Sequence, residues 1–314
     1  MSFVYLDLHT QRDDLRTDAL TGLAAHPKSI PPKYFYDEKG CQLFEAICKQ
    51  PEYAVTRTEH ALMASCMPEI AAAIGAVDCI IEPGAGCCSK VRRLLDALRP
   101  RQLVVLDIAG QALAAAAEPL AHTHPNLAVT AIGMDFIHDL EAALPHLPEG
   151  RRLIYYPVSS IGNFSPDEAI ALLQRFHYLA GADGQLLIGF DLKKDIEALH
   201  CAYNDAAGIT AEFNLNLLTR LNRELGANFD LARFRHDAFY NAQEGRIEMH
   251  LVSLAEQFVT LGDRRIHFKL GESLHTENSY KYNGSEFSSI ASRADWQLRK
   301  EWEREGFAVQ LYGR

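Results

Sequence analysis

Long apolar stretches are missing from the sequence. No apolar run reaches the roughly 18 residues that a membrane-spanning helix needs. The N-terminal segment MSFVYLDLHTQRDDLRTDAL also lacks the continuous apolar core of a signal peptide. We therefore expect a cytoplasmic protein without a membrane partner.

Excess positive charge is missing as well. The formal net charge is −10 at pH 7, and no segment carries a dense cluster of Lys and Arg. Proteins that bind nucleic acid or an anionic membrane through general electrostatics rely on such clusters. The charge balance argues against both partners and favours a small-molecule ligand.

Paired cysteine motifs are also absent. The seven cysteines are an odd number, and no two of them form a CxxC pair. A structural zinc site usually has two such pairs, or His ligands at set intervals. We expect neither a metal nor a disulfide. Cys87 and Cys88, which lie in a glycine-rich turn, could be redox-sensitive, but small buried thiols are the favoured interpretation.

What the chain does contain is a repeated alternation of short apolar strands and helices. It has 314 residues, of which 48% are hydrophobic, enough for one large domain or two ordinary ones. From about residue 60, helices alternate with the strand segments VDCIIEPGAG, QLVVLDIA, LAVTAIGMDF, RRLIYYPVSS and GQLLIGFDL. This alternation predicts a parallel, doubly wound α/β sheet with right-handed crossovers.

After Asp191 the alternation stops. Residues 195–235 have a helical pattern, and residues 245–282 alternate like antiparallel strands. The last segment, WQLRKEWEREGFAVQLYGR, predicts two strands joined at Arg304–Gly306. A terminal hairpin of this kind favours a class I methyltransferase fold, in which the last strand is antiparallel, over a nicotinamide-binding fold.

Three successive strand ends carry side chains suited to an adenosine-containing cofactor. Glu82–Gly86 forms a glycine turn, Asp107 ends the next strand, and Asp135–Phe136 ends the third. An acidic residue such as Asp107 can bind ribose hydroxyls, and all three positions lie where open α/β sheets bind ligands. The alternative is that Asp107 and Asp135 cap the helices that follow.

The glycine turn itself limits the choice of cofactor. It lacks the third glycine of GxGxxG, because Cys87-Cys88-Ser89 follows, and it lacks the lysine spacing of a phosphate-binding loop. Together with the terminal hairpin, this favours S-adenosylmethionine over a dinucleotide.

The fourth strand leads to a candidate substrate residue. Ser165 and Glu168 match a capping box, with Pro166 at the first helical position. The capping role is therefore filled, and Asn163 remains available beside the expected methyl donor, where its amide could bind an ammonium or a carboxylate group. The alternative is that Asn163 only stabilises the turn.

At this point the chain resembles a known family, the histidine Nα-methyltransferases of ergothioneine biosynthesis, which trimethylate free L-histidine to hercynine. The resemblance extends from IPPKYFYDEKGCQLFEAI and PEYAVTRTE, through SSIGNFSP and FDLKKD, to AYNDAAGITAEFNLNLLTRLNRELGANFD and RIEMHL. It implies a monomer with a methyltransferase domain at 58–192 and 283–314. It also implies a second, α+β substrate domain at 1–57 and 193–282.

The resemblance also implies roles for individual residues. Asn163 and Tyr203 would hold the substrate carboxylate and amine, Tyr36 would lie near the amine, and these three are the candidate catalytic residues. Glu277 and Ser279 would bind the imidazole. Phe44 and Met249 would complete the substrate pocket, and the cofactor residues would be Tyr53, Gly84, Lys90, Asp107, Asp135 and Phe136.

The imidazole assignment also has a physical basis. In an extended strand, Glu277 and Ser279 point the same way, so that each could serve one ring nitrogen. Taken without the resemblance, the two would more readily be assigned to a solvated strand face. One departure concerns Val158, which occupies the stretch where relatives carry a glycine near the amine, and this bears on how many methyl groups are added.

Other functions remain open at this stage. The chain could methylate another free amino acid, such as tryptophan. It could also be a nicotinamide-dependent oxidoreductase, or a non-catalytic module that binds S-adenosylmethionine.

Overall fold

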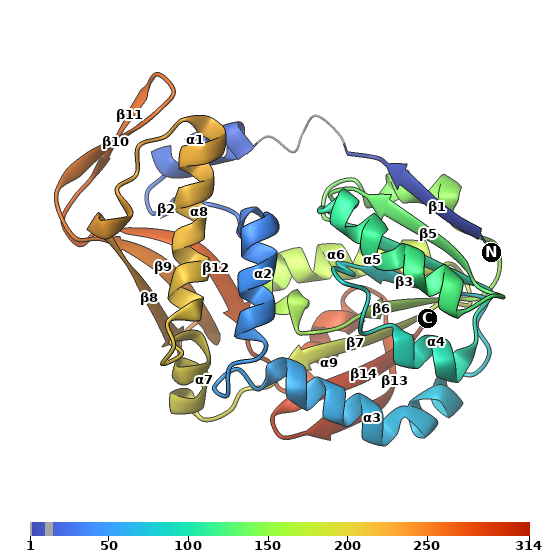
Figure 1. Cartoon of the computed structure of the whole chain (residues 1–314). Helices are drawn as coiled ribbons and strands as arrows, with labels where there is room; N and C mark the ends of the chain where they lie inside the picture. Colours follow the sequence, from blue (N-terminus) through green and yellow to red (C-terminus); the bar gives the residue numbers. More distant parts are fainter. Residues whose placement is uncertain (1, 10–14) are drawn as a thin grey trace. The chain divides into compact units, whose positions relative to one another are not determined.

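The computed structural model describes residues 2–9 and 15–314, and these form two compact units. Unit 1 contains residues 2–9, 55–192 and 282–314, and unit 2 contains residues 15–54 and 193–281. Figure 1 labels the elements of both. Residues 1 and 10–14, part of the segment expected in the second domain, lie outside the described residues.

Unit 1 is built on an eight-stranded sheet with the order β1-β5-β4-β3-β6-β7-β14-β13. The strands are β1 (Ser2–Asp7), β3 (Cys79–Pro83), β4 (Gln102–Asp107), β5 (Ala128–Gly133), β6 (Arg152–Tyr156), β7 (Gln185–Asp191), β13 (Gln297–Arg304) and β14 (Phe307–Gly313). Every residue of β3, β7 and β14 is buried, as expected for strands with both faces covered.

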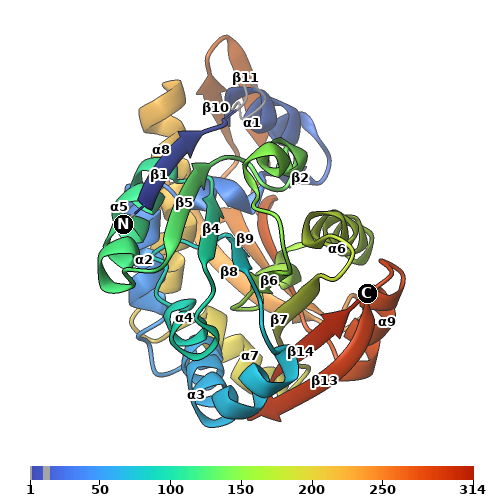
Figure 2. The ribbon, with the colours of Figure 1, turned by 90° about the vertical axis from the view of Figure 1, so that its right-hand side faces the viewer.

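Helices cover both faces of this sheet (Figure 2). α3 (Val55–Ile74), α4 (Arg92–Leu98) and α5 (Gly110–Thr123) lie on one face, and α6 (Pro166–Ala180) and α9 (Gly284–Ser292) lie on the other. The short 3-10 helices η2 (Leu140–His146) and η3 (Ser160–Asn163) follow β5 and β6.

The expected fold class is confirmed by strand direction. The strands from β1 to β7 pair in parallel, whereas β14 pairs antiparallel with β7 and β13 pairs antiparallel with β14. The last strand is therefore inserted between β7 and β13, as in class I methyltransferases. The predicted start of α6 is also confirmed, because Ser165 and Glu168 form a capping box before Pro166.

One expected boundary was wrong at the N-terminus. Residues 1–57 were expected in the second domain, but β1 pairs in parallel with β5 from Ser2↔Ala128 to Asp7↔Gly133. β1 lies at the edge of the sheet, so its side chains alternate between exposed and half-buried and give no strong apolar signal. Its backbone hydrogen bonds are nevertheless made with unit 1.

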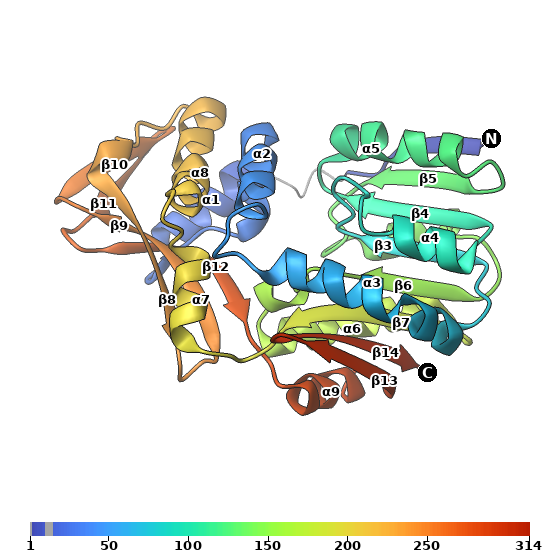
Figure 3. The same cartoon turned by 60° about the horizontal axis from the view of Figure 1, so that its bottom comes forward.

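Unit 2 combines helices with an antiparallel sheet of order β2-β12-β9-β8, in which only β2 runs parallel to its neighbour (Figure 3). α7 and α8 pack against β8 and β9, and α2 packs against α8. The elements are α1 (Leu15–Ala24), β2 (Lys28–Ser29), η1 (Pro32–Phe35), α2 (Glu38–Ile47), α7 (Ile196–Tyr203), α8 (Ile209–Leu225), η4 (Leu231–Arg233), β8 (Phe234–Asn241), β9 (Arg246–Ser253), β10 (Gln257–Leu261), β11 (Arg264–Phe268) and β12 (Ser273–Tyr280).

The helices were compared with the length and hydropathy that a membrane-spanning helix needs. Among the helices of residues 2–9 and 15–314, none is both long enough and apolar enough to cross a bilayer.

Candidate active site

The glycine turn after β3 has the backbone shape that only glycine adopts without strain. Gly84 and Gly86 have φ angles of 68° and 51°. A Cβ atom on Gly84 would lie 3.5 Å from Cζ of Phe136, so the turn runs directly beside that ring. The Gly86 amide donates a hydrogen bond to Oδ2 of Asp107 at 2.9 Å. The turn thus connects three of the predicted cofactor residues.

The two aspartates at the strand ends also hold backbone amides. Oδ1 of Asp107 accepts from the Ala109 amide at 2.9 Å, and Oδ1 of Asp135 accepts from the Ile137 amide at 2.9 Å. Asp107 precedes the N-cap of α5, Ala109, by two residues, so it is not the capping residue. Each carboxylate oxygen can accept two hydrogen bonds, so Asp107, with one backbone donor on each oxygen, has capacity left for ligand hydroxyl groups. Asp135 is more fully engaged, because Oδ1 also accepts from the His138 amide and Oδ2 lies 2.8 Å from Nδ1 of His138.

Glu82 is a residue whose importance the sequence analysis missed. It is fully buried, and neither carboxylate oxygen has a hydrogen-bond partner among the described residues. Burial raises the pKa of Glu82 to about 8, and the nearby charge of Lys90 opposes this rise. The only signal in the sequence was an acidic residue inside an apolar strand immediately before the glycine turn.

Glu59 is a second buried carboxylate that the sequence analysis missed. Its side chain, from α3, is 2% exposed, and Oε1 accepts the Val158 amide at 2.9 Å. A Cβ atom at Gly189 would lie 2.7 Å from this oxygen, so the glycine in β7 makes room for it. Burial raises the pKa of Glu59, and the nearby charge of Lys90 opposes this rise only in part.

The turn that Glu59 holds is strained. Val158 and Ser159 have φ angles of 68° and 61°, which β-branched and other L-residues rarely adopt. Oγ of Ser159 accepts the Asp191 amide at 2.9 Å, which ties the turn to the end of β7. Asn163 lies at the end of η3, four residues after Ser159. It is half-buried, and its side-chain amide makes no hydrogen bond with the described residues.

In unit 2, a second polar cluster joins α7 to β12. The hydroxyl of Tyr203 donates to Oγ of Ser279 at 2.8 Å. Nζ of Lys281 donates to the same Oγ at 2.9 Å and to the Tyr203 hydroxyl at 3.2 Å. Lys281, which the sequence analysis did not single out, is 2% exposed and lies over the Tyr203 ring, 5.1 Å from its centroid.

Glu277 lies two residues before Ser279 and faces Met249 across the β9–β12 pairing. Its carboxylate makes no hydrogen bond or ion pair with the described residues. The side chain keeps partial access to water, and its protein surroundings raise the pKa of Glu277 to about 7, an effect that Lys281 reduces. A polar group poised in this way is available to a ligand.

Aromatic rings surround this cluster. The ring centroids of Tyr53 and Tyr203 are 6.2 Å apart, those of Phe44 and Tyr53 are 6.5 Å apart, and those of Tyr36 and Phe44 are 5.8 Å apart. Phe213 of α8, which the sequence analysis also missed, lies 5.9 Å from Tyr36. Burial raises the pKa of Tyr53, as do the neighbouring groups of Tyr203, Cys48, Tyr36 and Glu277.

The family is shown by comparison with known proteins. A family model described as histidine-specific, S-adenosylmethionine-dependent methyltransferase matches residues 15–313. The chain belongs to this family. It is 40% identical to the histidine N-alpha-methyltransferase of Mycolicibacterium smegmatis, over 94% of this chain and 92% of that protein.

More distant relatives extend the comparison. The chain is 29% identical to the ergothioneine biosynthesis protein 1 of Neurospora crassa, over 88% of this chain and 32% of that protein. It is 26% identical to the 4-dimethylallyltryptophan N-methyltransferase of Claviceps purpurea, over 96% of this chain and 94% of that protein. The chain is therefore an S-adenosylmethionine-dependent methyltransferase.

The predicted site residues of this methyltransferase fall into two groups, one in each unit. The unit 1 group is Gly84, Lys90, Asp107, Asp135, Phe136 and Asn163, and the unit 2 group is Tyr36, Phe44, Tyr53, Tyr203, Met249, Glu277 and Ser279. Tyr53, expected with the cofactor residues, lies in unit 2 beside Tyr203.

The unit 1 residues fit S-adenosylmethionine. This cofactor carries a sulfonium and an ammonium charge. Glu82, in β3 just before the glycine turn, has a buried carboxyl group without a hydrogen-bond partner among the described residues. Gly84 lets the backbone approach a ligand closely, and Asp107 retains acceptor capacity for ribose hydroxyl groups.

Unit 2 contains a cluster of three potential metal ligands. Ligand atoms of Glu248, His250 and His275 lie within 4.8 Å of one another. However, the two imidazole rings stack, with centroids 4.6 Å apart and planes inclined by 15°. Because an imidazole binds a metal through a lone pair in its ring plane, two stacked rings direct their lone pairs along parallel planes rather than toward one ion.

The carboxylate in this cluster is already engaged. Oε1 of Glu248 lies 2.8 Å from Nη2 of Arg246, and Oε2 lies 3.0 Å from Nε2 of His250. Burial would raise the pKa of Glu248, but the hydrogen bonds and the Arg246 charge lower it to about 2. We interpret the cluster as a stabilised polar stack and assign no metal to it.

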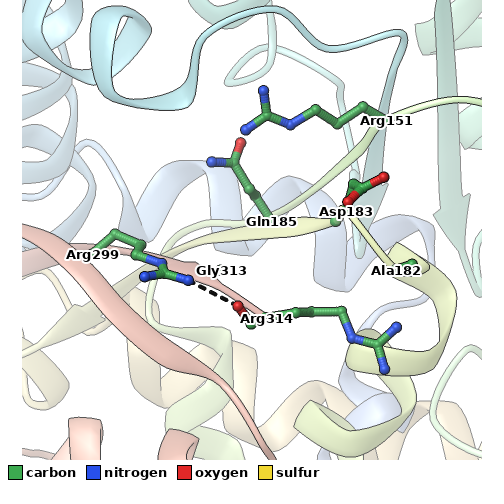
Figure 4. A pocket seen from close by; sticks show the side chains of 8 residues that line it. Arg151, Ala182, Asp183, Gln185, Arg299, Gly313 and Arg314 are labelled. Carbon is green, nitrogen blue, oxygen red and sulfur yellow. Dashed lines mark hydrogen bonds between the residues drawn. The ribbon is translucent and has the colours of Figure 1, made fainter.

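A pocket lies at the end of the unit 1 sheet opposite the glycine turn, where β7 begins and β14 ends (Figure 4). Arg151, Asp183, Arg299 and Arg314 contribute to its lining, and Nη2 of Arg299 donates to the Arg314 carbonyl at 2.8 Å. Open α/β sheets bind their ligands at the carboxyl ends of parallel strands. This pocket is at the amino end of β7, so it has no part in our assignment of the active site.

Proposed function

We propose that this methyltransferase acts on the α-amino nitrogen of free L-histidine. The observation that carries the proposal is the pair Glu277 and Ser279. The two side chains lie two residues apart in β12, and the carboxylate of Glu277 has no partner among residues 2–9 and 15–314. A carboxylate and a hydroxyl at this spacing match the two nitrogens of an imidazole ring.

The remaining site residues take roles around the amino acid backbone. Asn163 and Tyr203 hold the α-carboxylate and the amine, and Tyr36 lies near the amine. Phe44 and Met249 form apolar walls. Tyr53 completes the aromatic group around Tyr203, and it also reaches the cofactor in this proposal. Gly84, Lys90, Asp107, Asp135 and Phe136 hold the cofactor.

When bound, S-adenosylmethionine supplies a sulfonium methyl group that is already activated for in-line displacement. The protein therefore has to orient the amine and exclude water rather than provide strong acid or base catalysis. The α-amino group has a reference pKa of about 8, so a neutral fraction is present near neutral pH. Tyr36 or a water molecule accepts the released proton.

We further propose successive methylation to Nα,Nα,Nα-trimethylhistidine, hercynine, which places the enzyme in ergothioneine biosynthesis. The final product carries a quaternary ammonium group, and aromatic faces such as those of Tyr36, Phe44 and Tyr203 stabilise such cations. We also propose that the enzyme works as a cytoplasmic monomer on this small molecule, without nucleic-acid or membrane partners.

Methylation of tryptophan is the second candidate, because one relative is named for a tryptophan derivative. The polar pair in β12 argues for histidine instead. An indole has one N–H group and no ring acceptor, so it could bond to Glu277 but could not accept from Ser279. A site that buries two polar groups discriminates strongly against ligands that satisfy only one.

The test is to incubate the enzyme with S-adenosylmethionine and a mixture of the twenty amino acids and to analyse the products by mass spectrometry. We expect histidine with one, two and three added methyl groups. Methyl groups on another amino acid, and none on histidine, would overturn the substrate assignment and leave the reaction class intact. A nicotinamide oxidoreductase or a non-catalytic module would give no methylated product.

A further inference from the structure

The buried ammonium group of Lys281 sets the hydrogen-bond directions in the unit 2 cluster. Its Nζ lies 2.9 Å from Oγ of Ser279 and 3.2 Å from the hydroxyl of Tyr203. These two oxygens lie 2.8 Å from each other, so the three groups form a triangle. An ammonium group has only donors, and both hydroxyl oxygens must therefore accept from it.

The bond between the two hydroxyls has a preferred direction. A phenol is far more acidic than an alcohol and is the better donor of the two. The adjacent Lys281 charge further favours proton donation by Tyr203. Tyr203 accordingly donates to Oγ of Ser279 over 2.8 Å. Both lone pairs of Ser279 are then occupied, one by Lys281 and one by Tyr203, and its own hydrogen is left for a ligand.

Glu277 provides a hydrogen-bond acceptor on the same face of β12 as the Ser279 donor. Its carboxylate, when ionised, can only accept, and it makes no bond with the described residues. Burial raises the pKa of Glu277 to about 7, and the charge of Lys281 limits this rise. A carboxyl group keeps an acceptor oxygen in either protonation state. The cluster thus offers one acceptor, Glu277, and one donor, Ser279, separated by two residues along β12.

We propose that Lys281 fixes Ser279 as a hydrogen-bond donor, so that the site binds the substrate ring as a single tautomer of neutral imidazole. Its N–H group donates to Glu277, and its unprotonated nitrogen accepts from Ser279. This inference rests on the proposed function, since it specifies which form of the histidine ring is recognised. Lys281 acts as a positioning residue, because it works through the Ser279 hydroxyl.

The charges of the cluster support the neutral form. An imidazolium would place a second positive charge next to the buried ammonium group and direct an N–H group at the hydrogen of Ser279. A buried charge without a partner is strongly unfavourable. The cluster therefore selects against the protonated ring.

The decisive experiment is nitrogen NMR of ¹⁵N-labelled L-histidine bound to the wild-type enzyme with S-adenosylhomocysteine. The free imidazole has a reference pKa of about 6.5, so spectra are recorded at a pH about one unit below this value. We expect one protonated and one unprotonated ring nitrogen in the bound state. Two protonated nitrogens, the signature of an imidazolium, would overturn the inference.

A binding experiment gives an independent measurement. The dissociation constant of L-histidine is compared with that of a ring-fluorinated histidine, whose imidazole remains neutral at low pH. Between pH 6.5 and 5.5 we expect L-histidine to weaken more than the fluorinated analogue, by up to about tenfold per pH unit. Equal weakening of both ligands, or preferential weakening of the analogue, would contradict neutral-ring binding.

Variants then test the role of Lys281. Lys281→Met keeps the length of the side chain but removes its charge and donors, which lets Ser279 accept again. We expect the pH-dependent difference between the two ligands to shrink in this variant and to persist in Lys269→Met, which changes an exposed lysine in the same unit. An unchanged difference in Lys281→Met would remove Lys281 from the inference. If Lys281→Met does not fold, the NMR spectrum of the wild type still decides the protonation state.

Failure of this inference is distinguishable from failure of the proposed function. If histidine is methylated but bound as imidazolium, only the role of Lys281 is wrong. If histidine is neither bound nor methylated, the substrate assignment itself is wrong.

Discussion

The carboxylate of Glu59 accepts a hydrogen bond from the backbone amide of Val158, 99 residues further along the chain, at 2.9 Å. Val158 is the β-branched residue at φ 68°, so this bond stabilises a backbone shape that its own side chain disfavours. The turn leads through Ser159 into η3 and Asn163. A buried acid on α3 therefore helps to position a proposed substrate residue.

We expect Glu59→Ala to destabilise the protein more than Glu59→Gln does. The alanine variant leaves the buried Val158 amide without an acceptor, which costs about 1–3 kcal/mol in the free energy of unfolding. The glutamine variant retains an acceptor oxygen at the same position. Chemical denaturation compares the stabilities, and steady-state kinetics with histidine compares the activities. Equal losses in both variants would show that the charge, rather than the hydrogen bond, is what matters.

Replacement of Val158 by glycine relieves the strain at this turn. A left-handed backbone costs a residue with a side chain about 1–2 kcal/mol, and glycine avoids this cost. The gain is offset by the loss of a buried side chain and by the greater entropy of the unfolded chain. We expect Val158→Gly to change stability by less than about 1 kcal/mol.

The same variant tests the effect of this position on methylation. With the Val158 side chain removed, we expect dimethylhistidine to be converted to trimethylhistidine faster relative to the first methylation. Mass spectrometry of a time course measures this ratio. Val252→Gly, at a buried position in the extended strand β9, is the matched control and should lose stability without changing the ratio. A ratio that does not move in Val158→Gly would separate the strained turn from the extent of methylation.

The sequence allowed the strand and helix order of unit 1 to be predicted because its signals are local. Strands buried on both faces are continuous apolar runs, and the side chains of Ser165 and Glu168 each accept from the other's backbone amide at the start of the next helix. β1 was missed because an edge strand has a weak apolar pattern and its partner, β5, lies more than 120 residues away. β8 was missed for a similar reason, since most of its residues keep some exposure to solvent.

The site could be predicted only where residue type alone suggests a role. Asp107 is an acid at a strand end, and this position alone suggested a cofactor role. Glu277 was singled out by the family resemblance, because its residue type and spacing alone would also fit a solvated strand face. Glu59, Glu82 and Lys281 are charged residues that in a sequence suggest solvated positions, and only the fold shows that all three are buried. Their importance depends on which partners they have or lack, and tertiary contacts decide this.

The raised pKa of Glu82 predicts how stability depends on pH. The pKa of Glu82 is about 8 in the folded protein, above its ordinary value of 4.5, so the folded state holds a proton that the unfolded state releases. The contribution of Glu82 to the free energy of unfolding is therefore largest below about pH 4.5. It declines as the pH rises toward 8, by up to about 1.4 kcal/mol per pH unit.

The measurement for Glu82 is denaturation of the ligand-free protein at pH 5, 6.5 and 8, with roughly equal ionic strength throughout. Glu82→Gln removes the titrating group and retains the size of the side chain. We expect the variant to gain stability relative to the wild type as the pH rises. The control is Glu303→Gln, at an exposed position of β13 in the same unit, which should follow the wild-type curve. Parallel curves for the wild type and Glu82→Gln would contradict the assignment.

Replacement of Glu277 tests whether this residue binds the substrate and not the cofactor. Loss of a charged hydrogen-bond partner costs about 1.5–3 kcal/mol, so Glu277→Ala should weaken histidine binding by roughly 10- to 150-fold. The affinity for S-adenosylhomocysteine should stay within about twofold of the wild-type value, because the predicted cofactor turn belongs to unit 1. Calorimetric titration with each ligand in turn measures both constants. The matched control is Asp107→Asn, for which we expect the reverse pattern, with weakened cofactor binding. Equal losses of the two affinities in Glu277→Ala would refute a specific role in holding the imidazole, whereas a loss confined to histidine would establish Glu277 as a determinant of the substrate.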